Sequence, residues 1–144
     1  SNNEIIIMGY RFTKHSKNEF IDNIKQALEE GKRVHLLTDH VSILENYLKE
    51  FFANMLNSYR RRFNLWSYED NEDTIMHIKS IVIDSDRMYL GSANFSRRGI
   101  TENIEMGAIM YEKDAIRTVK ALFKWLTEKD ERVIKVTKGM LIVK

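Results

Sequence analysis

The amino-acid sequence predicts an α/β fold in which a mixed β-sheet is flanked by helices. Short apolar runs alternate with segments of helical periodicity over residues 4–59, which favours a parallel sheet core. Residues 62–111 add further strand-like runs with short connections. With 144 residues, 43% of them hydrophobic, the chain can bury a sizeable core. We therefore expect residues 1–144 to form one domain, which the missing initiator methionine allows to be excised from a longer protein.

Two strand–helix units are predicted in the first part of the chain. They are a strand at 4–12, a helix at 16–31, a strand at 33–39 and a helix at 42–59. Each helix opens with a serine and a glutamate at capping-box spacing, Ser16 with Glu19 and Ser42 with Glu45. Gly31 can end the first helix, because glycine readily adopts the left-handed conformation found after helix C-termini.

The second part of the chain adds strands and a third helix. The predicted strands are 62–68, 75–83, 87–91 and 103–111, the helix is 114–130, and residues 132–143 are strand-like or irregular. Apolar residues recur at helical spacing along this helix and are expected to face the core. They are Ile116, Val119, Phe123 and Leu126.

Composition excludes several classes of protein. The chain has no cysteine, which rules out disulfides and thiolate metal sites, and its net charge of +2 is far from strongly basic. No stretch approaches the roughly 20 apolar residues of a membrane span, and the first residues lack a basic leader. We expect a cytoplasmic protein without stable membrane association, whose charge permits a polyanionic partner but does not demand one.

One segment, HIKSIVIDSDRMYLGSAN at residues 77–94, gathers an unusual set of polar residues. Side chains alternate between faces along a strand, so His77 and Lys79 point the same way and Asp84 points the opposite way. Gly91 leaves room for the close approach of a ligand to the backbone. Asp84 is expected to organise the turn or a neighbouring cation rather than to contact substrate.

The run DSDR between the two strands of this segment has turn composition. A turn centred on Ser85 and Asp86 would gather a candidate nucleophile, a cation and an amide donor on one patch. This pairing sets Ile83 opposite Met88, Lys79 opposite Ser92, and His77 opposite Asn94. The segment is therefore predicted to be a hairpin that carries the functional site.

The polar residues of the hairpin stand in the pattern H-x-K-x4-D-x6-G-S-x-N, which resembles the HKD signature of the phospholipase D superfamily. Its fixed positions are His77, Lys79, Asp84, Gly91, Ser92 and Asn94. Residues 5–39 are also similar to the first strand, helix and second strand of the family, and residues 103–111 to the strand after its motif. The chain most resembles the short bacterial endonucleases that carry one motif, and related phosphodiesterases.

The resemblance implies a role for each motif residue. His77 would be the nucleophile or its acid partner. Lys79 and Asn94 would bind the phosphate, with Ser92 as a further hydrogen bonder, and Glu105 matches an acidic residue that supports the histidine. A neutral imidazole can attack phosphorus at pH near 7 to form a phosphohistidine, and an ammonium with an amide can hold the phosphate oxygens without a metal. We therefore expect no metal and no cofactor.

Residues that directly follow the motif are candidates for contacts with substrate. Phe95 could stack on a base, and Arg97 and Arg98 could hold flanking phosphates. An arginine pair that leads into a turn is equally an ordinary surface feature. The basic run at 60–62 is more typical of a solvated helix C-terminus than of a nucleic-acid contact.

Catalysis in the superfamily uses two HxK motifs, whereas this chain has one. His35 and His40 have no lysine two residues on, and His15, although followed by Lys17, lacks the rest of the pattern. A two-fold dimer would place two copies of the motif face to face. The resemblance therefore implies a homodimer with a shared active site, in which the second subunit supplies the proton for the leaving group.

The sequence thus predicts a metal-independent phosphodiesterase: a nuclease that works through a covalent phosphohistidine in a homodimeric active site, with DNA preferred to RNA. The first alternative is a phospholipase or phosphatidyltransferase acting on phospholipids. The second is a nucleic-acid-binding module of a larger restriction or defence protein, although intact His77 and Lys79 argue against loss of catalysis. Additional domains in the natural protein are compatible with each interpretation.

Overall fold

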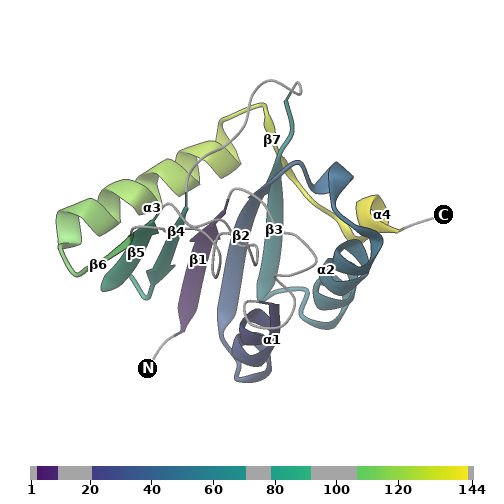
Figure 1. Ribbon diagram of the computed structural model, residues 1–144, viewed down its shortest axis with the longest axis horizontal. Coiled ribbons are helices and arrows are strands. Elements are labelled where there is room, and N and C mark those ends of the chain that lie inside the picture. Colours follow the sequence, from purple (N-terminus) through teal and green to yellow (C-terminus); the bar gives the residue numbers. More distant parts are fainter. Residues whose placement is uncertain (1–2, 10–20, 71–78, 92–106, 143–144) are drawn as a thin grey trace.

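The computed structural model is a mixed seven-stranded sheet with helices on both faces (Figure 1). The structure describes residues 3–9, 21–70, 79–91 and 107–142. The strands are β1 (Glu4–Met8), β2 (Arg33–Asp39), β3 (Phe63–Tyr68), β4 (Ser80–Ile83), β5 (Arg87–Gly91), β6 (Gly107–Met110) and β7 (Val133–Lys135). The helices are α1 (Asp22–Glu29), α2 (Asn46–Ser58), α3 (Lys113–Glu128) and α4 (Lys138–Leu141), with a 3₁₀ helix η3 at Val41–Ile43. The predicted α/β class is confirmed.

The strands follow the order β6-β5-β4-β1-β2-β3-β7 across the sheet. β1, β2 and β3 are parallel, and β4 is antiparallel to β1. β5 is antiparallel to both β4 and β6, and β7 is antiparallel to β3 at the other edge. The two strand–helix units therefore build the parallel half of the sheet, since parallel strands need a crossover connection. The hairpin of β4 and β5 extends the sheet on the other side of β1.

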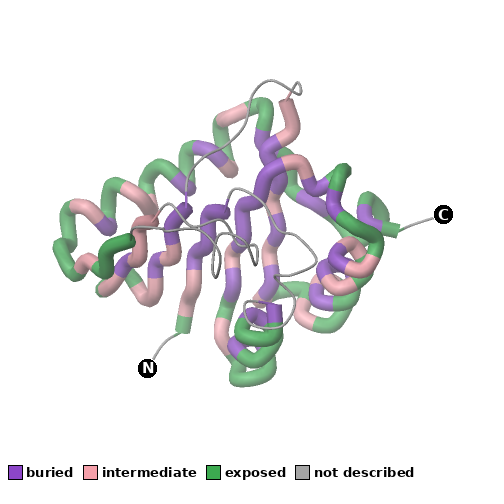
Figure 2. Tube along the Cα trace, viewed as in Figure 1, coloured by how far each residue is buried: buried purple, intermediate pink, exposed green. Residues whose placement is uncertain are grey.

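The central strands are buried on both faces of the sheet (Figure 2). Helices α1, α2 and α4 pack against one face, where the Phe52 and Phe63 rings are stacked with their centres 6.1 Å apart. Helix α3 packs against the other face, where the Trp66 and Phe123 rings meet edge to face at 5.4 Å. Alternate side chains of each strand enter alternate layers, as the period of two along a strand requires. Among the described helices, none is long and apolar enough to cross a membrane.

Helix α2 begins later than the sequence predicts. Residues 41–43 form η3, and α2 starts at Asn46 with Glu45 as its N-cap. The Ser42 hydroxyl and backbone amide both donate to the Glu69 carboxylate instead of capping the helix. The capping-box prediction at Ser42 is therefore wrong, because a long-range carboxylate takes the place of the local partner.

Other boundaries follow the prediction more closely. Gly31 has a φ of 89° and ends α1 in the left-handed conformation, as expected. The capping-box pair Ser16 and Glu19 lies outside the described residues. Strand β7 and helix α4 occupy the C-terminal segment, for which the sequence left strand or irregular structure open.

The pairing of β4 with β5 is shifted by one residue from the predicted register. Ile83 pairs with Arg87 rather than with Met88. Gly91 N donates to the Lys79 carbonyl at 3.1 Å, so Gly91 and not Ser92 lies opposite Lys79. A shift of one residue changes which side chains share a face. The predicted pairing of His77 with Asn94 lies outside the described residues.

The conformation of the β4–β5 turn causes this shift. Asp84 and Ser85 have φ values of 53° and 66°, and Asp86 N donates to the Ile83 carbonyl at 3.2 Å. Two consecutive residues with positive φ are typical of a tight hairpin turn. The turn is therefore centred one residue earlier than predicted, on two positions where glycine or asparagine is the usual signal.

Candidate functional site

Three of the predicted site residues lie in the described part of the chain: Lys79, Asp84 and Gly91. The others lie outside it, and their roles stay predictions. They are His77, Ser92, Asn94, Phe95, Arg97, Arg98 and Glu105. The surroundings of Lys79 therefore show what the structure contributes to the site.

Lys79 lies at the edge of the sheet where the parallel strands end. β1, β2, β3 and β5 all run toward this edge, and β4 begins there, directly after Lys79. Ligands of open α/β sheets bind outside the carboxyl ends of the strands. Lys79 is therefore placed where a ligand of this fold is expected.

Glycines flank Lys79 in the row of residues that crosses the sheet at its level. Gly91 of β5 lies opposite Lys79 and pairs in turn with Gly107 of β6. On the other side, Gly9 continues β1 beyond its last paired residue and lies beside Lys79. Because glycine has no side chain, this row leaves space around the lysine that other side chains or a ligand can fill.

The ring of Tyr89 fills the part of this space that lies above Gly91 and Gly107. A methyl group on Gly107 would lie 2.5 Å from Tyr89 Oη, and one on Gly91 would overlap the same hydroxyl. Glycine is therefore required at both positions while the ring lies there. On this side of the backbone, the ring occupies the room that the sequence assigned to a ligand near Gly91, so substrate contact by Gly91 stays a prediction.

Burial distinguishes Lys79 from the other lysines in the part of the chain that the structure describes. Only 8% of its surface is exposed, whereas lysine is rarely so buried without a specific reason. Low-dielectric surroundings strengthen the attraction between an ammonium and a ligand's anionic oxygens. The geometry therefore suits a phosphate-binding role better than a solubilising one.

Asp84 lies at the opposite end of the β4–β5 hairpin. Its Oδ1 accepts hydrogen bonds from the backbone amides of Asn3 at 2.7 Å and Glu4 at 2.8 Å. Its own amide donates to the Glu4 carbonyl at 2.9 Å. These bonds tie the turn to the start of β1, at the end of the strands away from Lys79.

His40 lies at the same edge as Lys79, directly after β2. Its Nδ1 is 2.9 Å from Asp39 Oδ2, and its Nε2 is 2.9 Å from the Asp70 carbonyl oxygen. Burial by itself lowers the pKa of His40, but the hydrogen bonds to Asp70 and Asp39 outweigh it and raise the pKa above its ordinary value. Both ring nitrogens thus contact the chain's own oxygens, which indicates a structural histidine.

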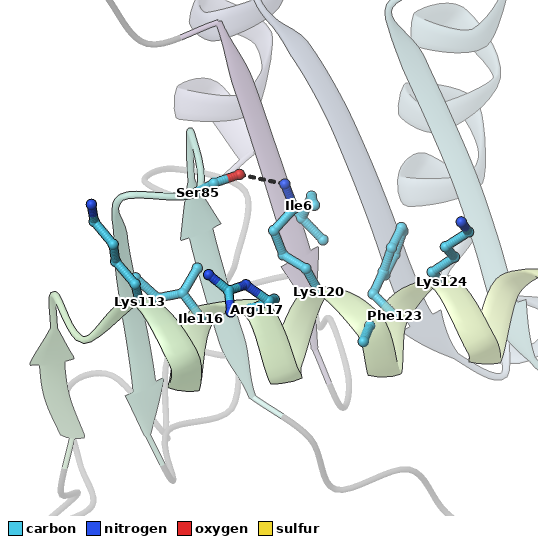
Figure 3. Close-up of a pocket in the computed structure, with 9 residues that line it drawn as sticks. Ile6, Ser85, Lys113, Ile116, Arg117, Lys120, Phe123 and Lys124 are labelled. Carbon is cyan, nitrogen blue, oxygen red and sulfur yellow. Dashed lines mark hydrogen bonds between the residues drawn. The ribbon is translucent and has the colours of Figure 1, made fainter.

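A cavity of about 540 Å³ lies on the other face of the sheet, beside α3 and the β4–β5 turn (Figure 3). Cations from successive turns of α3 line it: Lys113, Arg117, Lys120 and Lys124. Lys120 Nζ donates to the Ser85 hydroxyl and lies 3.9 Å from Glu4 Oε1, while Arg117 pairs with Asp114 at 3.1 Å. Buried side chains of Ile6, Ile116 and Phe123 also line the cavity. We call Lys113, Arg117, Lys120 and Lys124 the α3 basic strip.

Neither Tyr89 nor the α3 basic strip is among the site residues predicted from the sequence. For Tyr89 a signal exists, because an aromatic residue two positions before a strand-terminal glycine can cover that glycine. The α3 cations recur at positions 113, 117, 120 and 124, the spacing of one helix face. This second periodicity is interleaved with the apolar one along the same helix.

Comparisons with known proteins place the chain in a family. The profile described as "Cardiolipin synthase, PLD-like domain" matches residues 1–127. The DISARM protein DrmC of Bacillus paralicheniformis is 26% identical over 109 residues, which are 75% of this chain and 44% of DrmC. Cardiolipin synthase 2 of Staphylococcus epidermidis is 29% identical over 108 residues, which are 72% of this chain and 21% of the synthase. The chain thus spans less than half the length of either relative.

Among solved structures, NucT from Helicobacter pylori is similar in fold. Its TM-score is 0.72 at 21% identity, and the match covers 94% of this chain and 84% of NucT. The shared feature is the mixed sheet with helices on both faces. Because the family profile covers most of the sequence, including the hairpin that carries Lys79, the chain belongs to the phospholipase D superfamily.

Proposed function

We propose that this chain is a metal-independent phosphodiesterase that hydrolyses nucleic acid through a phosphohistidine at His77. The observation that carries the proposal is Lys79, a buried ammonium at the ligand-binding edge of the sheet, two residues after His77 in the HxK pattern. Phosphodiester cleavage needs a fixed cation where negative charge builds on the phosphate oxygens. Lys79 supplies such a cation.

The proposed reaction has two steps. In the first, a neutral His77 imidazole attacks phosphorus and the bond to the leaving oxygen breaks, while the second subunit's histidine gives that oxygen a proton. In the second, water gives a proton to the second subunit's histidine and attacks phosphorus, and the P–N bond breaks, which restores both histidines. Lys79 and Asn94 hold the phosphate oxygens, Ser92 adds a hydrogen bond, and Glu105 orients the histidine.

The proposed homodimer has support from β6 and the residue after it. Ile109 and Tyr111 are 68% and 69% exposed. By strand alternation they share a face with Gly107, in the row that contains Lys79. Neighbouring large apolar side chains that are this exposed are typical of contact surfaces. A second copy of the chain bound over β6 would cover them on the face of the sheet that carries Lys79.

The α3 basic strip favours nucleic acid as the substrate. Its cations are three or four residues apart, which corresponds to about 4.5–6 Å along a helix axis. A row of this kind can follow a phosphate backbone. Phe95, Arg97 and Arg98 would contact the strand nearer the motif, and DNA is the form of nucleic acid we expect.

A phospholipase or phosphatidyltransferase is the second candidate, and one observation favours it. Leu122 and Trp125 of α3 are 39% and 52% exposed, and lysines lie beside them in the helix. Exposed apolar residues with a tryptophan and flanking lysines are typical of helices that lie in a membrane interface. The matching family profile also carries cardiolipin synthase in its description.

A substrate panel separates these functions. The protein is incubated with single-stranded DNA, duplex DNA, RNA and phosphatidylglycerol vesicles, each with and without EDTA. We expect cleavage of nucleic acid that EDTA does not change and that His77→Asn abolishes without loss of fold. Cleavage lost in EDTA would contradict the mechanism, and turnover of lipid alone would support the second candidate. Nucleic-acid binding without any cleavage would favour a binding module.

The dimer is tested in the same samples by light scattering across micromolar concentrations. We expect a particle of twice the chain mass wherever activity is present. A fully active monomer would contradict the shared active site.

A further inference from the structure

Tyr89 carries a hydroxyl group to the Lys79 edge of the sheet. It belongs to β5 and pairs with Ile81 of β4 and Ile109 of β6. Strand alternation therefore puts its side chain on the same face as Lys79. The contacts that methyl groups would make at Gly91 and Gly107 show that the ring lies along the strand, with Oη above Gly91. The hydroxyl thus points toward the end of β5 at which the motif continues.

The hydroxyl lies close to the stem of Lys79. Gly91 is directly opposite Lys79, with Gly91 N donating to the Lys79 carbonyl at 3.1 Å. Cβ positions directly opposite each other in an antiparallel pair are about 4.5–5.5 Å apart. Because Oη takes the place that a Gly91 Cβ would occupy, it lies roughly this far from the Lys79 side chain. The phenol of Tyr89 and the stem of Lys79 therefore lie side by side on one face.

Packing explains the ring of Tyr89 but not its hydroxyl. An aromatic ring that covers strand glycines stabilises a sheet, and phenylalanine would do this equally well. Within the described parts of the chain, no hydrogen bond from Tyr89 Oη is present. A phenol is a hydrogen-bond donor, and the absence of side chains at Gly91 and Gly107 leaves the space in which Oη lies.

We propose that Tyr89 Oη donates a hydrogen bond to a non-bridging oxygen of the phosphate held by Lys79, and so positions the substrate. The proposal rests on the proposed function, since it assumes that Lys79 binds a phosphodiester. The bond gains strength as negative charge builds on the phosphate oxygens during attack by His77. Its loss therefore lowers kcat more than it raises KM.

The decisive variant is Tyr89→Phe, which keeps the ring above the glycines and removes only the hydroxyl. We expect kcat/KM on the substrate cleaved by the wild type to fall about 10- to 100-fold, the range for a hydrogen bond to a charged group. The melting temperature should be unchanged. Tyr59→Phe, at the end of α2, is the matched control and should leave both quantities unchanged. A kcat/KM for Tyr89→Phe within twofold of the wild type would overturn the proposal.

A binding measurement separates this proposal from the proposed function. Orthovanadate, an oxyanion that resembles a phosphate, is titrated calorimetrically into the wild type, Tyr89→Phe and Lys79→Met. Weaker vanadate binding in both variants supports the role of Tyr89 even if the wild type cleaves no substrate. Vanadate binding that Tyr89→Phe leaves unchanged, or a wild type that neither binds vanadate nor cleaves, would overturn it.

The placement of the ring is tested with Gly107. Gly107→Ala should lower the melting temperature of the wild type, because the methyl group overlaps Tyr89. In a Tyr89→Ala background the same change should have much less effect, since the overlapping ring is gone. An equal loss in both backgrounds would place the ring elsewhere and would overturn the proposal.

Discussion

The β4–β5 hairpin has two ends, and the cations beside them lie in different surroundings. At the open end, Lys79 is 8% exposed and stands among glycines at the carboxyl edge of the parallel strands. At the turn end, Lys120 of α3 contacts Ser85 and lies near Glu4, and its side chain is 33% exposed. Lys113, Arg117 and Lys124 of the same strip are more exposed still.

This difference separates two uses of positive charge. A buried ammonium is held in one geometry, and its attraction to a phosphate is screened little by salt. Exposed cations on a helix each contribute little and are strongly screened, so they suit a polyanion that is held loosely over several contacts. Under the proposed function, the open end would carry the chemistry and the turn end would retain a strand non-specifically.

The largest effect is expected from Lys79→Met. Removing the ammonium should lower kcat by at least about 10³-fold, since a fixed donor at developing phosphate charge is worth roughly 10²–10³ and this donor also carries a full charge. Lys25→Met, on an exposed position of α1, removes one charge elsewhere and is the control. Steady-state kinetics on the cleaved substrate measures both. Retention of more than a tenth of the turnover would mean that the open end is not the reaction centre.

A smaller effect is expected at the turn end, from Lys113→Glu combined with Lys124→Glu. Affinity for a nucleic acid, measured by fluorescence anisotropy in a His77→Asn background, should fall about 10-fold at low salt. The slope of log K against log salt should become shallower by about 1.4–1.8, because each of the two lost phosphate contacts accounts for about 0.7–0.9.

The double variant Lys25→Glu with Lys138→Glu makes the same charge change away from α3 and is the matched control. It should weaken binding much less. Equal losses in the two double variants would show that net charge alone governs binding. The α3 basic strip would then have no specific role in binding nucleic acid.

The two ends also differ in how well the sequence predicts them. The positions of the strands, their alternation with helices and the apolar face of α3 can be predicted from the periodicity of apolar residues. Burial of one face of an element imposes this regular pattern on its sequence. The strand register around Lys79 cannot be predicted in this way. It depends on the positive φ values of Asp84 and Ser85, and an Asp-Ser pair is not a usual signal for them. A single-residue error in the turn moved the predicted partner of Lys79 from Gly91 to Ser92.

Long-range contacts account for the other differences from the sequence-based prediction. Ser42 bonds to Glu69, 27 positions away, instead of capping α2. The place of Tyr89 above Gly91 and Gly107 depends on strand pairing between segments that are not adjacent in the sequence. The motif can be recognised in the sequence because its residues lie close together along the chain. The side chains that surround it come from several strands, so the sequence does not show which of them are neighbours.

Asp84→Ala tests whether the acidic position of the hairpin turn is structural. The change removes hydrogen bonds from the amides of Asn3 and Glu4, and the free energy of unfolding in urea should fall by about 1–3 kcal/mol. Turnover per folded molecule should stay within twofold of the wild type. Asp86→Ala, with a side chain 68% exposed in the same turn, should change stability by less than about 0.5 kcal/mol. Lost turnover in folded Asp84→Ala would give the turn end a catalytic role.

The smallest effect is a pH dependence that differs in sign between two histidines, His40 near the Lys79 edge and His35 near the turn edge. The hydrogen bonds of His40 to Asp70 and Asp39 outweigh burial and raise its pKa. Its contribution to stability is therefore fully present below the unfolded pKa of about 6.5 and is lost as pH rises through the folded value. Burial lowers the pKa of His35 despite its contact with Glu4, so its contribution is present above about 6.5 and is lost as pH falls through the folded value.

Urea unfolding of the wild type, His40→Gln and His35→Gln at pH 5.5 and 8.5 measures this difference. The loss of unfolding free energy in His40→Gln should be larger at pH 5.5, because the charged imidazole is the form that the Asp39 carboxylate and the Asp70 carbonyl stabilise. The loss in His35→Gln should be larger at pH 8.5, because the buried ring is favoured when neutral. If both losses change with pH in the same direction, burial of His35 and the hydrogen bonds of His40 do not set the two pKa values. The opposite pKa shifts of the two histidines would then be wrong.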